Sequence, residues 1–135
     1  MDYIETGAQE GGLIPVLLGL SPQTHALAHR IFRERNTVSH VFCEKRPFTA
    51  PLSICAKFHA VPHTANDRLM VEALCSFAAQ YQNADVILYL IPCTEHYINT
   101  LWYHAAELES HFVIGSAPAF GETLLSIGTL KGEDA

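Results

Sequence analysis

Two continuous apolar runs set the strongest limit on how this chain can fold. The first is LIPVLLGL at 13–20, and the second is DVILYLI at 85–91. Runs of this length without alternating polar residues are typical of strands that are covered on both faces by helices, as in parallel sheets. The two runs therefore predict an α/β domain in which both strands lie in the interior of the sheet.

Helical patterns alternate with these runs. Ser21 and Pro22 are typical of a helix start, because serine caps free N–H groups and proline fits the first turn; this helix extends to about Asn36. A second helix is expected to open at Asn66–Asp67, and a third at Thr94. Weaker strand patterns are found at 38–43, 56–61 and 112–115.

Apolar stripes predict which side of the two later helices faces the core. The stripe of the second helix consists of Leu69, Met70, Ala73, Leu74, Phe77 and Tyr81. The stripe of the third consists of Ile98, Leu101, Trp102, Ala105 and Leu108. We expect all of these side chains to pack against the sheet.

Strands that alternate with helices of ten or more residues indicate parallel pairing and right-handed crossovers. We therefore predict one doubly wound, Rossmann-like α/β domain at 13–120, with a mainly parallel sheet of about five strands and the first strand in its centre. Residues 1–12 are expected to be a flexible lead-in, and 121–135 a tail or the start of a linker with one further helical turn.

Composition narrows the function classes. A formal net charge of −6 without a cluster of Lys or Arg argues against nucleic acid or an anionic membrane surface as a partner. The four cysteines are spread singly, as in a reducing compartment. No apolar run approaches the roughly 18 residues of a membrane span, and the first residues lack a signal-peptide pattern. We expect a cytoplasmic protein with small-molecule or protein partners.

Doubly wound sheets bind ligands beyond the carboxyl ends of the strands, near the point where strand order reverses. Free N–H groups at the start of the helix at Thr94 favour an anion such as a substrate carboxylate. Glu95 either complements the helix dipole or contacts a substrate amine, and the two roles are equally open. The expected substrate-binding residues at these strand ends are Gly19, Leu20, Ser21, Glu44, Cys93, Thr94 and Glu95.

Nucleotide-binding signatures are missing from the first turn. A dinucleotide site needs glycines at fixed offsets, whereas GLSPQTHALAH supplies only Gly19 and has Pro22 where a backbone donor is wanted. The sequence has no P-loop, and the first strand ends without the acidic cluster of a receiver domain. Glu44 stands where an acid could hold a ribose hydroxyl, but a solvated charge beside Lys45 and Arg46 is the favoured interpretation.

Eight histidines make a metal site worth weighing. His25 and His29 lie four residues apart on the predicted first helix and could face one ion, but no third ligand is evident, so solvated side chains are favoured. His59 and His63 flank a strand end, and the argument that they bind a metal ion is no stronger. Cys93 precedes a helix start, which can lower a thiol pKa, but no base is evident, so packing is favoured over nucleophilic catalysis. We predict no catalytic or metal-binding residues.

Three segments carry a resemblance to a known family. They are IPVLLGLSPQTHALAHRIF at 14–32, IPCTEHY at 91–97 and AAELESHFVI at 105–114. Together they resemble the amino-terminal, pre-ATP-grasp domain of ATP-grasp carboxylate–amine ligases, the group that includes D-aspartate ligases. In this resemblance Gly19, Leu20 and Ser21 match the first loop of the active-site cleft, and Thr94 and Glu95 match the polar turn after the fourth strand.

The resemblance implies a ligase that activates a carboxylate as an acyl phosphate, which an amine then attacks. ATP and Mg²⁺ are held mainly by the remaining ATP-grasp domains, so this chain alone is expected to have little activity. The family usually has a lysine-containing segment that leads into its ATP-binding lobe, whereas 116–135 offers only Lys131. The alternative is a free-standing Rossmann-like module that binds a small molecule or a protein. An exposed strand edge could also pair two copies as a homodimer.

Overall fold

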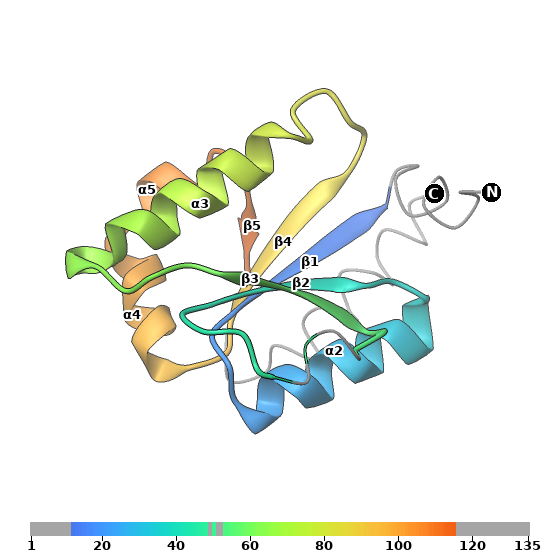
Figure 1. Cartoon of the computed structure of the whole chain (residues 1–135). Helices are drawn as coiled ribbons and strands as arrows, with labels where there is room; N and C mark the ends of the chain where they lie inside the picture. Colours follow the sequence, from blue (N-terminus) through green and yellow to red (C-terminus); the bar gives the residue numbers. More distant parts are fainter. Residues whose placement is uncertain (1–11, 49, 51–52, 116–135) are drawn as a thin grey trace.

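The computed structural model describes residues 12–48, 50 and 53–115 of the chain. Residues 1–11 of the predicted lead-in, the predicted tail at 121–135 and Lys131 lie outside the described residues. None of the helices in the described part is long and apolar enough to cross a membrane. The elements shown in Figure 1 are β1 (Leu13–Leu18), α2 (Pro22–Arg35), β2 (Ser39–Cys43), β3 (Ala56–Ala60), a 3₁₀ turn (Ala65–Asp67), α3 (Arg68–Ala79), β4 (Ile87–Pro92), α4 (Glu95–Tyr103), α5 (Ala105–Leu108) and β5 (Val113–Ile114).

All five strands are parallel and lie in the order β3-β2-β1-β4-β5. Leu17 of β1 pairs with Val41 of β2 on one side and with Ile91 of β4 on the other. Strand order reverses between β1 and β4, because the chain builds outward through β2 and β3 and then returns to the far side of β1. The predicted doubly wound fold, with both apolar runs in the interior of the sheet, is confirmed.

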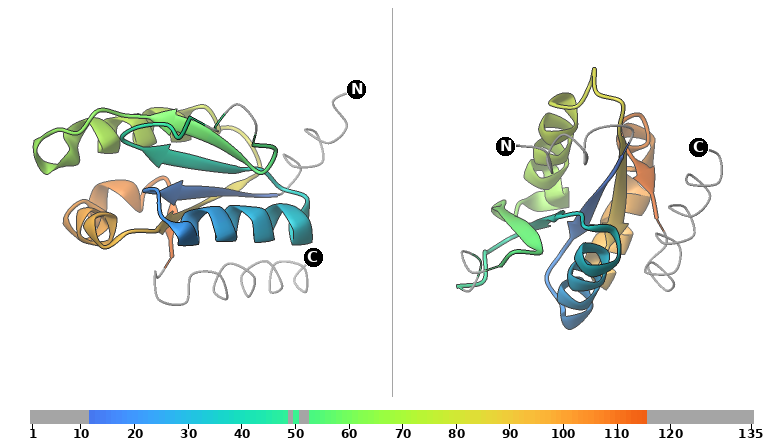
Figure 2. Two further views of the ribbon diagram at one scale, coloured as in Figure 1. Left: turned by 60° about the horizontal axis from the view of Figure 1, so that its bottom comes forward. Right: turned by 90° about the vertical axis from the view of Figure 1, so that its right-hand side faces the viewer.

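Helices cover both faces of the sheet, as Figure 2 shows for α2 and α3. Val16 and Leu18 of β1 point into a core that contains Leu74 of α3 and Leu101 of α4. Leu17, between them in the sequence, points to the opposite face, in the core that α2 closes. Successive side chains of a strand alternate between faces, so a strand buried on both sides carries no polar position. This double burial explains why the first run is apolar throughout.

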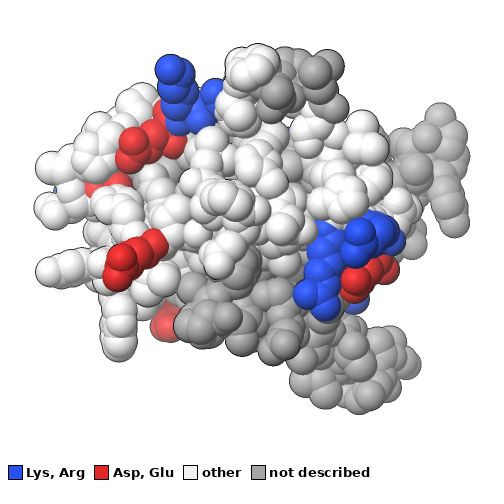
Figure 3. Space-filling view, turned by 90° about the horizontal axis from the view of Figure 1, so that it is seen from below, with Lys and Arg blue, Asp and Glu red and all other residues white. Residues whose placement is uncertain are grey.

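The exposed side of α2 ends in basic residues. Arg33 and Arg35 lie in its last turn, where positive charge complements the helix dipole, and Arg30 contacts Glu34 at 3.4 Å. Figure 3, seen from the side of α2, shows blue and red side chains in a few separate groups with uncharged surface between them. The charge seen on this face is therefore divided among small groups.

Two side chains of the predicted apolar stripes face solvent. Leu69 is 38% exposed and Trp102 is 79% exposed, so their placement in the core was wrong. Helix α3 begins only at Arg68, after the 3₁₀ turn, and its buried side is formed by Met70, Val71, Leu74, Phe77 and Ala78. Trp102 follows the buried Leu101 directly, and adjacent helical residues point about 100° apart. The predicted third helix is also two helices, α4 and α5, which meet at His104.

A pair of histidines links β2 to the edge strand β3. His40 Nδ1 and His59 Nε2 are 3.0 Å apart, and the His59 ring stacks on Phe42 with ring centres 4.4 Å apart. Burial, followed by the neighbouring His59 and Lys57, lowers the pKa of His40 to about 4 from its ordinary 6.5. Burial also lowers the pKa of His59. Both rings are therefore neutral at pH 7, and one donates the hydrogen bond that the other accepts.

Acid is expected to destabilise the domain through His40. The unfolded chain binds a proton at this residue as the pH falls below 6.5, whereas the folded chain does so only near pH 4. Stability present above pH 6.5 is therefore lost towards pH 4, by about 1–2 kcal/mol between pH 7 and pH 5 for this residue. Urea denaturation of wild type and His40→Gln at both pH values measures the loss, which should shrink in the variant.

The control for this measurement is His29→Gln, because His29 is exposed on α2. Its pH dependence should equal that of the wild type. Equal pH dependence in His40→Gln and the wild type would show that the His40 pKa is not lowered in the folded state.

Candidate functional site

The carboxyl ends of the parallel strands bring four turns to one edge of the sheet. Gly19 follows β1, Glu44 follows β2, His63 lies just beyond β3, and Thr94 follows β4. This edge includes the reversal point between β1 and β4, where doubly wound proteins bind their ligands. The functional site is therefore sought among these turns and the helices that begin there.

The turn after β1 packs directly against the start of α4. Gly19 has φ +92°, and a Cβ at this position would lie 2.7 Å from Thr94 Cγ2 and 2.9 Å from Tyr97 Cδ2. Only glycine fits such a close approach in this conformation. Side chains of α4 thus fill the space beside Gly19, which supports the argument against a dinucleotide site at this turn.

Ser21 and Cys93 hold the two central turns together. Ser21 Oγ donates to the Cys93 carbonyl oxygen at 3.1 Å, while Ser21 and Thr24 form a reciprocal capping box at the start of α2. The Cys93 thiol is buried, and burial raises its pKa to about 11. A thiol that stays protonated at neutral pH is a poor nucleophile, which supports a packing role for Cys93.

Thr94 caps α4 and Glu95 lies in its first turn. The Thr94 hydroxyl oxygen accepts from the Tyr97 N–H at 3.4 Å, as the sequence predicted for the helix start. Glu95 is exposed and Leu20 is half-buried against the core on the α2 side. Contacts of a substrate with these residues, and with Gly19, Ser21 and Cys93, stay predictions.

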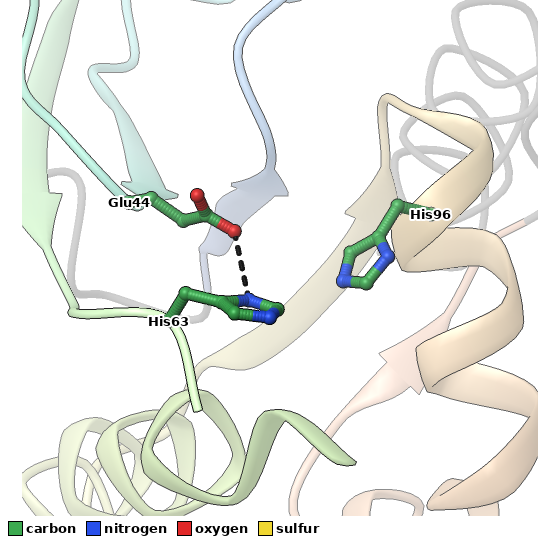
Figure 4. A group of neighbouring side chains, drawn as sticks. All are labelled: Glu44, His63 and His96. Atoms are coloured by element: carbon green, nitrogen blue, oxygen red, sulfur yellow. Dashed lines mark ion pairs between the residues drawn. The ribbon is translucent and has the colours of Figure 1, made fainter. Parts of the chain in front are cut away.

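A second group of polar side chains, the histidine–carboxylate cluster, consists of Glu44, His63, Asp67 and His96. His63 Nδ1 lies 3.1 Å from Glu44 Oε2 and 3.8 Å from Asp67 Oδ1, and His96 Nε2 lies 3.0 Å from Asp67 Oδ2. Figure 4 shows that Glu44, His63 and His96 point toward one another from three separate segments. Glu44 follows β2, His63 and Asp67 lie between β3 and α3, and His96 lies in α4.

Asp67 is the buried member of this cluster. It is 7% exposed, and its carboxylate accepts hydrogen bonds from the Thr100 hydroxyl and from His96 Nε2. Burial opposes ionisation, but the hydrogen bonds from Thr100 and His96 and the nearby imidazoles outweigh it and lower the pKa of Asp67. Asp67 is therefore a buried, ionised carboxylate at neutral pH.

The backbone at Asp67 is unusual for a helix start. Asn66 and Asp67 both have positive φ, +57° and +54°, a conformation that asparagine and aspartate adopt more readily than other side-chain-bearing residues. Asp67 occupies the cap position of α3 but makes no capping hydrogen bond, whereas the Thr64 hydroxyl accepts from the Leu69 N–H at 3.1 Å. The carboxylate is turned away from its usual capping role and toward His96 and Thr100.

A groove of about 640 Å³ opens beside the cluster, between the start of α3 and helices α4 and α5. Its lining includes His63, Asp67 and His96 from the cluster, and Tyr103 and His104 further along. The volume of the groove is large enough for a small molecule. The cluster is therefore accessible from outside through a concave surface.

Sequence reasoning found one member of the cluster and missed three. Glu44 was predicted as a site residue from its place at a strand end. His63 was weighed as a metal ligand and not favoured, and Asp67 was interpreted as part of a helix start. His96 was not considered as a site residue, although it lies in the segment IPCTEHY. The useful signal was that His63 and His96 each lie within a few residues of a strand's carboxyl end. Within the described part of the chain, the group of three potential metal ligands is Glu44, His63 and His96, not the pair on α2.

Gly19→Ala is expected to destabilise the domain by roughly 2–4 kcal/mol, because it combines a disfavoured φ with overpacking against Thr94 and Tyr97. Urea denaturation at pH 7 measures the change. Gly115→Ala is the comparison. Its Cβ would lie 3.1 Å from Tyr89 Oη and 3.4 Å from Ile91 Cγ1, without a left-handed φ, so its cost should be smaller. A Gly19→Ala variant as stable as wild type would contradict the close packing of the two turns.

Comparison with known proteins gives no match. No protein-family model matches the chain, no curated protein matches it, and no solved structure matches it. The resemblance to ATP-grasp ligases therefore stays a prediction that rests on the three sequence segments. The substrate, ATP and Mg²⁺ implied by that resemblance stay predictions as well.

Proposed function

We propose that this chain is the substrate-side, amino-terminal domain of an ATP-dependent carboxylate–amine ligase of the ATP-grasp type. The observation that carries the proposal is the close packing of the turns after β1 and β4 at the reversal point of a doubly wound sheet. Gly19 and Ser21 in the first turn and Thr94 in the second belong to the segments that resemble the ligase family. The proposed substrate lies against these two turns.

The chemistry proposed for this edge is substrate binding. Thr94 caps one N–H of α4, and the first N–H groups of a helix have no partner within the helix, so they favour a substrate carboxylate. The carboxylate attacks the γ-phosphate of ATP to give an acyl phosphate and ADP, and an amine then displaces phosphate to form the C–N bond. ATP and Mg²⁺ are held by the remaining ATP-grasp domains, and this domain supplies one wall of the cleft.

A specific observation favours the alternative of a free-standing binding module. The histidine–carboxylate cluster and its groove are formed within the described residues of this chain, without a second domain. A gene that continues past Ala135 into an ATP-binding lobe would support the ligase, and one that stops there would support the module. A cytoplasmic location is proposed in both cases, supported by four free thiols at Cys43, Cys55, Cys75 and Cys93.

The chain alone is expected not to bind ATP tightly. Its first turn has no glycine-rich phosphate loop, and the space beside Gly19 is filled by Thr94 and Tyr97. Titration calorimetry with Mg·ATP should give no binding at low micromolar concentrations. A dissociation constant in the low micromolar range would contradict the proposed division of labour between domains.

Substrate binding is tested by two-dimensional NMR of the ¹⁵N-labelled chain during titration with D-aspartate, the carboxylate suggested by the family resemblance. The largest amide shifts are expected at Gly19, Thr94 and Glu95. Gln80, at the far end of α3, should not move. Shifts concentrated instead on Arg33 and Arg35 at the end of α2 would show simple charge attraction and would contradict the proposed site.

A further inference from the structure

We propose that Glu44, His63 and His96 bind one divalent transition-metal ion of the Zn²⁺ class at the carboxyl edge of the sheet. The inference comes from the meeting of two imidazoles and a carboxylate that three separate segments bring together. It does not depend on the ligase proposal, because the ligands all belong to this chain and the Mg²⁺ of the ligase reaction is assigned to other domains.

The distances fit a site that closes around an ion. Ligand atoms of Glu44, His63 and His96 lie within 4.8 Å of one another. In a tetrahedral zinc site with bonds of about 2.0–2.2 Å, neighbouring ligand atoms are about 3.4 Å apart. All three side chains are about half exposed, so small rotations about their side-chain bonds can bring the atoms closer without moving the backbone.

The charges around the cluster favour a cation. Glu44 and Asp67 contribute two carboxylates, and in the described part of the chain their ion-pair partners are the histidines rather than Lys or Arg. Arg68, next to Asp67 in sequence, contacts Glu72 at 3.6 Å, and within the described residues neither Lys45 nor Arg46 forms an ion pair with Glu44. The carboxylate groups of Glu44 and Asp67 attract a divalent cation to this edge of the sheet.

Asp67 is in position to strengthen the site. Its carboxylate lies 3.0 Å from His96 Nε2 and 3.8 Å from His63 Nδ1. A metal-binding histidine commonly donates its other ring N–H to a carboxylate, which orients the ring. Asp67 lies outside the group of mutually close ligand atoms, so it supports the site by orienting His96, and its hydrogen bond from Thr100 fixes its own direction.

The ligand types select among metal ions. Imidazole nitrogens combined with carboxylate oxygens suit Zn²⁺ and its neighbours in the first transition series. Mg²⁺ and Ca²⁺ prefer sites made of oxygen ligands alone. The groove that His63, Asp67 and His96 line gives a small ligand access to the bound ion.

Titration of the metal-free whole chain with Zn²⁺ by calorimetry tests the proposal. The expected result is one ion per chain with a dissociation constant at or below the low micromolar range. His63→Ala and His96→Ala should each weaken binding by more than about 100-fold, since even groups that only support a ligand change affinity by about 10–100-fold. His29→Ala, on the exposed side of α2, is the matched control and should bind as wild type does.

Further variants keep the test informative if an alanine variant unfolds. Asp67→Asn keeps the size of the side chain, and asparagine also tolerates the positive φ at this position. Glu44→Gln changes a side chain that is exposed. Each should weaken Zn²⁺ binding about 10–100-fold with unchanged circular dichroism of the metal-free protein. Co²⁺ bound to the wild type should show the strong visible absorption of a tetrahedral site.

Two results would overturn the proposal. One is wild-type binding of Zn²⁺ weaker than about 100 μM, an affinity expected of scattered surface histidines rather than of a formed site. The other is a loss of affinity in His29→Ala as large as that in His63→Ala, which would assign the ion to the His25 and His29 pair on α2.

Discussion

The pairing of β1 with β4 fixes the position of everything that follows from this fold. Six residue pairs join the two strands in register, from Leu13 with Ile87 to Leu18 with Pro92. Both strands therefore end at the same level, where the Cys93 N–H donates to the Leu18 carbonyl oxygen at 2.8 Å. The helices that follow begin at the same edge of the sheet on opposite faces, and the turn at Gly19 meets the start of α4. A slip in this register would separate the two turns and, with them, His96 from the strand ends on the other side.

A buried carboxylate then connects the helix layer to this sheet edge. Burying a charge is costly unless hydrogen bonds and opposite charge compensate for it, and Asp67 has the Thr100 hydroxyl and two imidazoles as partners. These partners come from α4 and from the segment after β3, so the carboxylate ties together elements that are far apart in sequence. The left-handed backbone at Asn66 and Asp67 persists because this surrounding network holds it.

The sequence reveals those features that depend on burial alone. Double burial of a strand leaves a continuous apolar run, so the central positions of β1 and β4 could be predicted. Helix faces were harder, because the predicted stripe contained both Leu69 and Met70, which point about 100° apart on α3, and only Met70 is buried. Trp102 was misplaced for the related reason that apolar character does not require burial.

In the candidate site, too, local features could be predicted from the sequence and long-range contacts could not. Glu44 could be predicted because a strand end is a local property. The meeting of His63 with His96 could not, because it depends on the lengths of two turns and on how α4 leaves the sheet. Asp67 was interpreted from the common capping role of aspartate at a helix start, whereas its side chain serves the tertiary contact with Thr100. Local rules fail here because the long-range network determines where the carboxylate points.

His96 lies in the first turn of α4, where the electrostatic potential of the helix start and that of two nearby carboxylates have opposite signs. The start of a helix carries partial positive charge, which disfavours a cation nearby, and Glu44 and Asp67 supply the negative charge that offsets it. A divalent ion held by the cluster would offset the charge of these two carboxylates and leave the partial positive charge of the helix start unopposed. The groove beside the cluster would then favour an anionic ligand more strongly than it does without the ion. A bound metal ion and an anionic ligand in the groove would thus stabilise each other at this edge of the sheet.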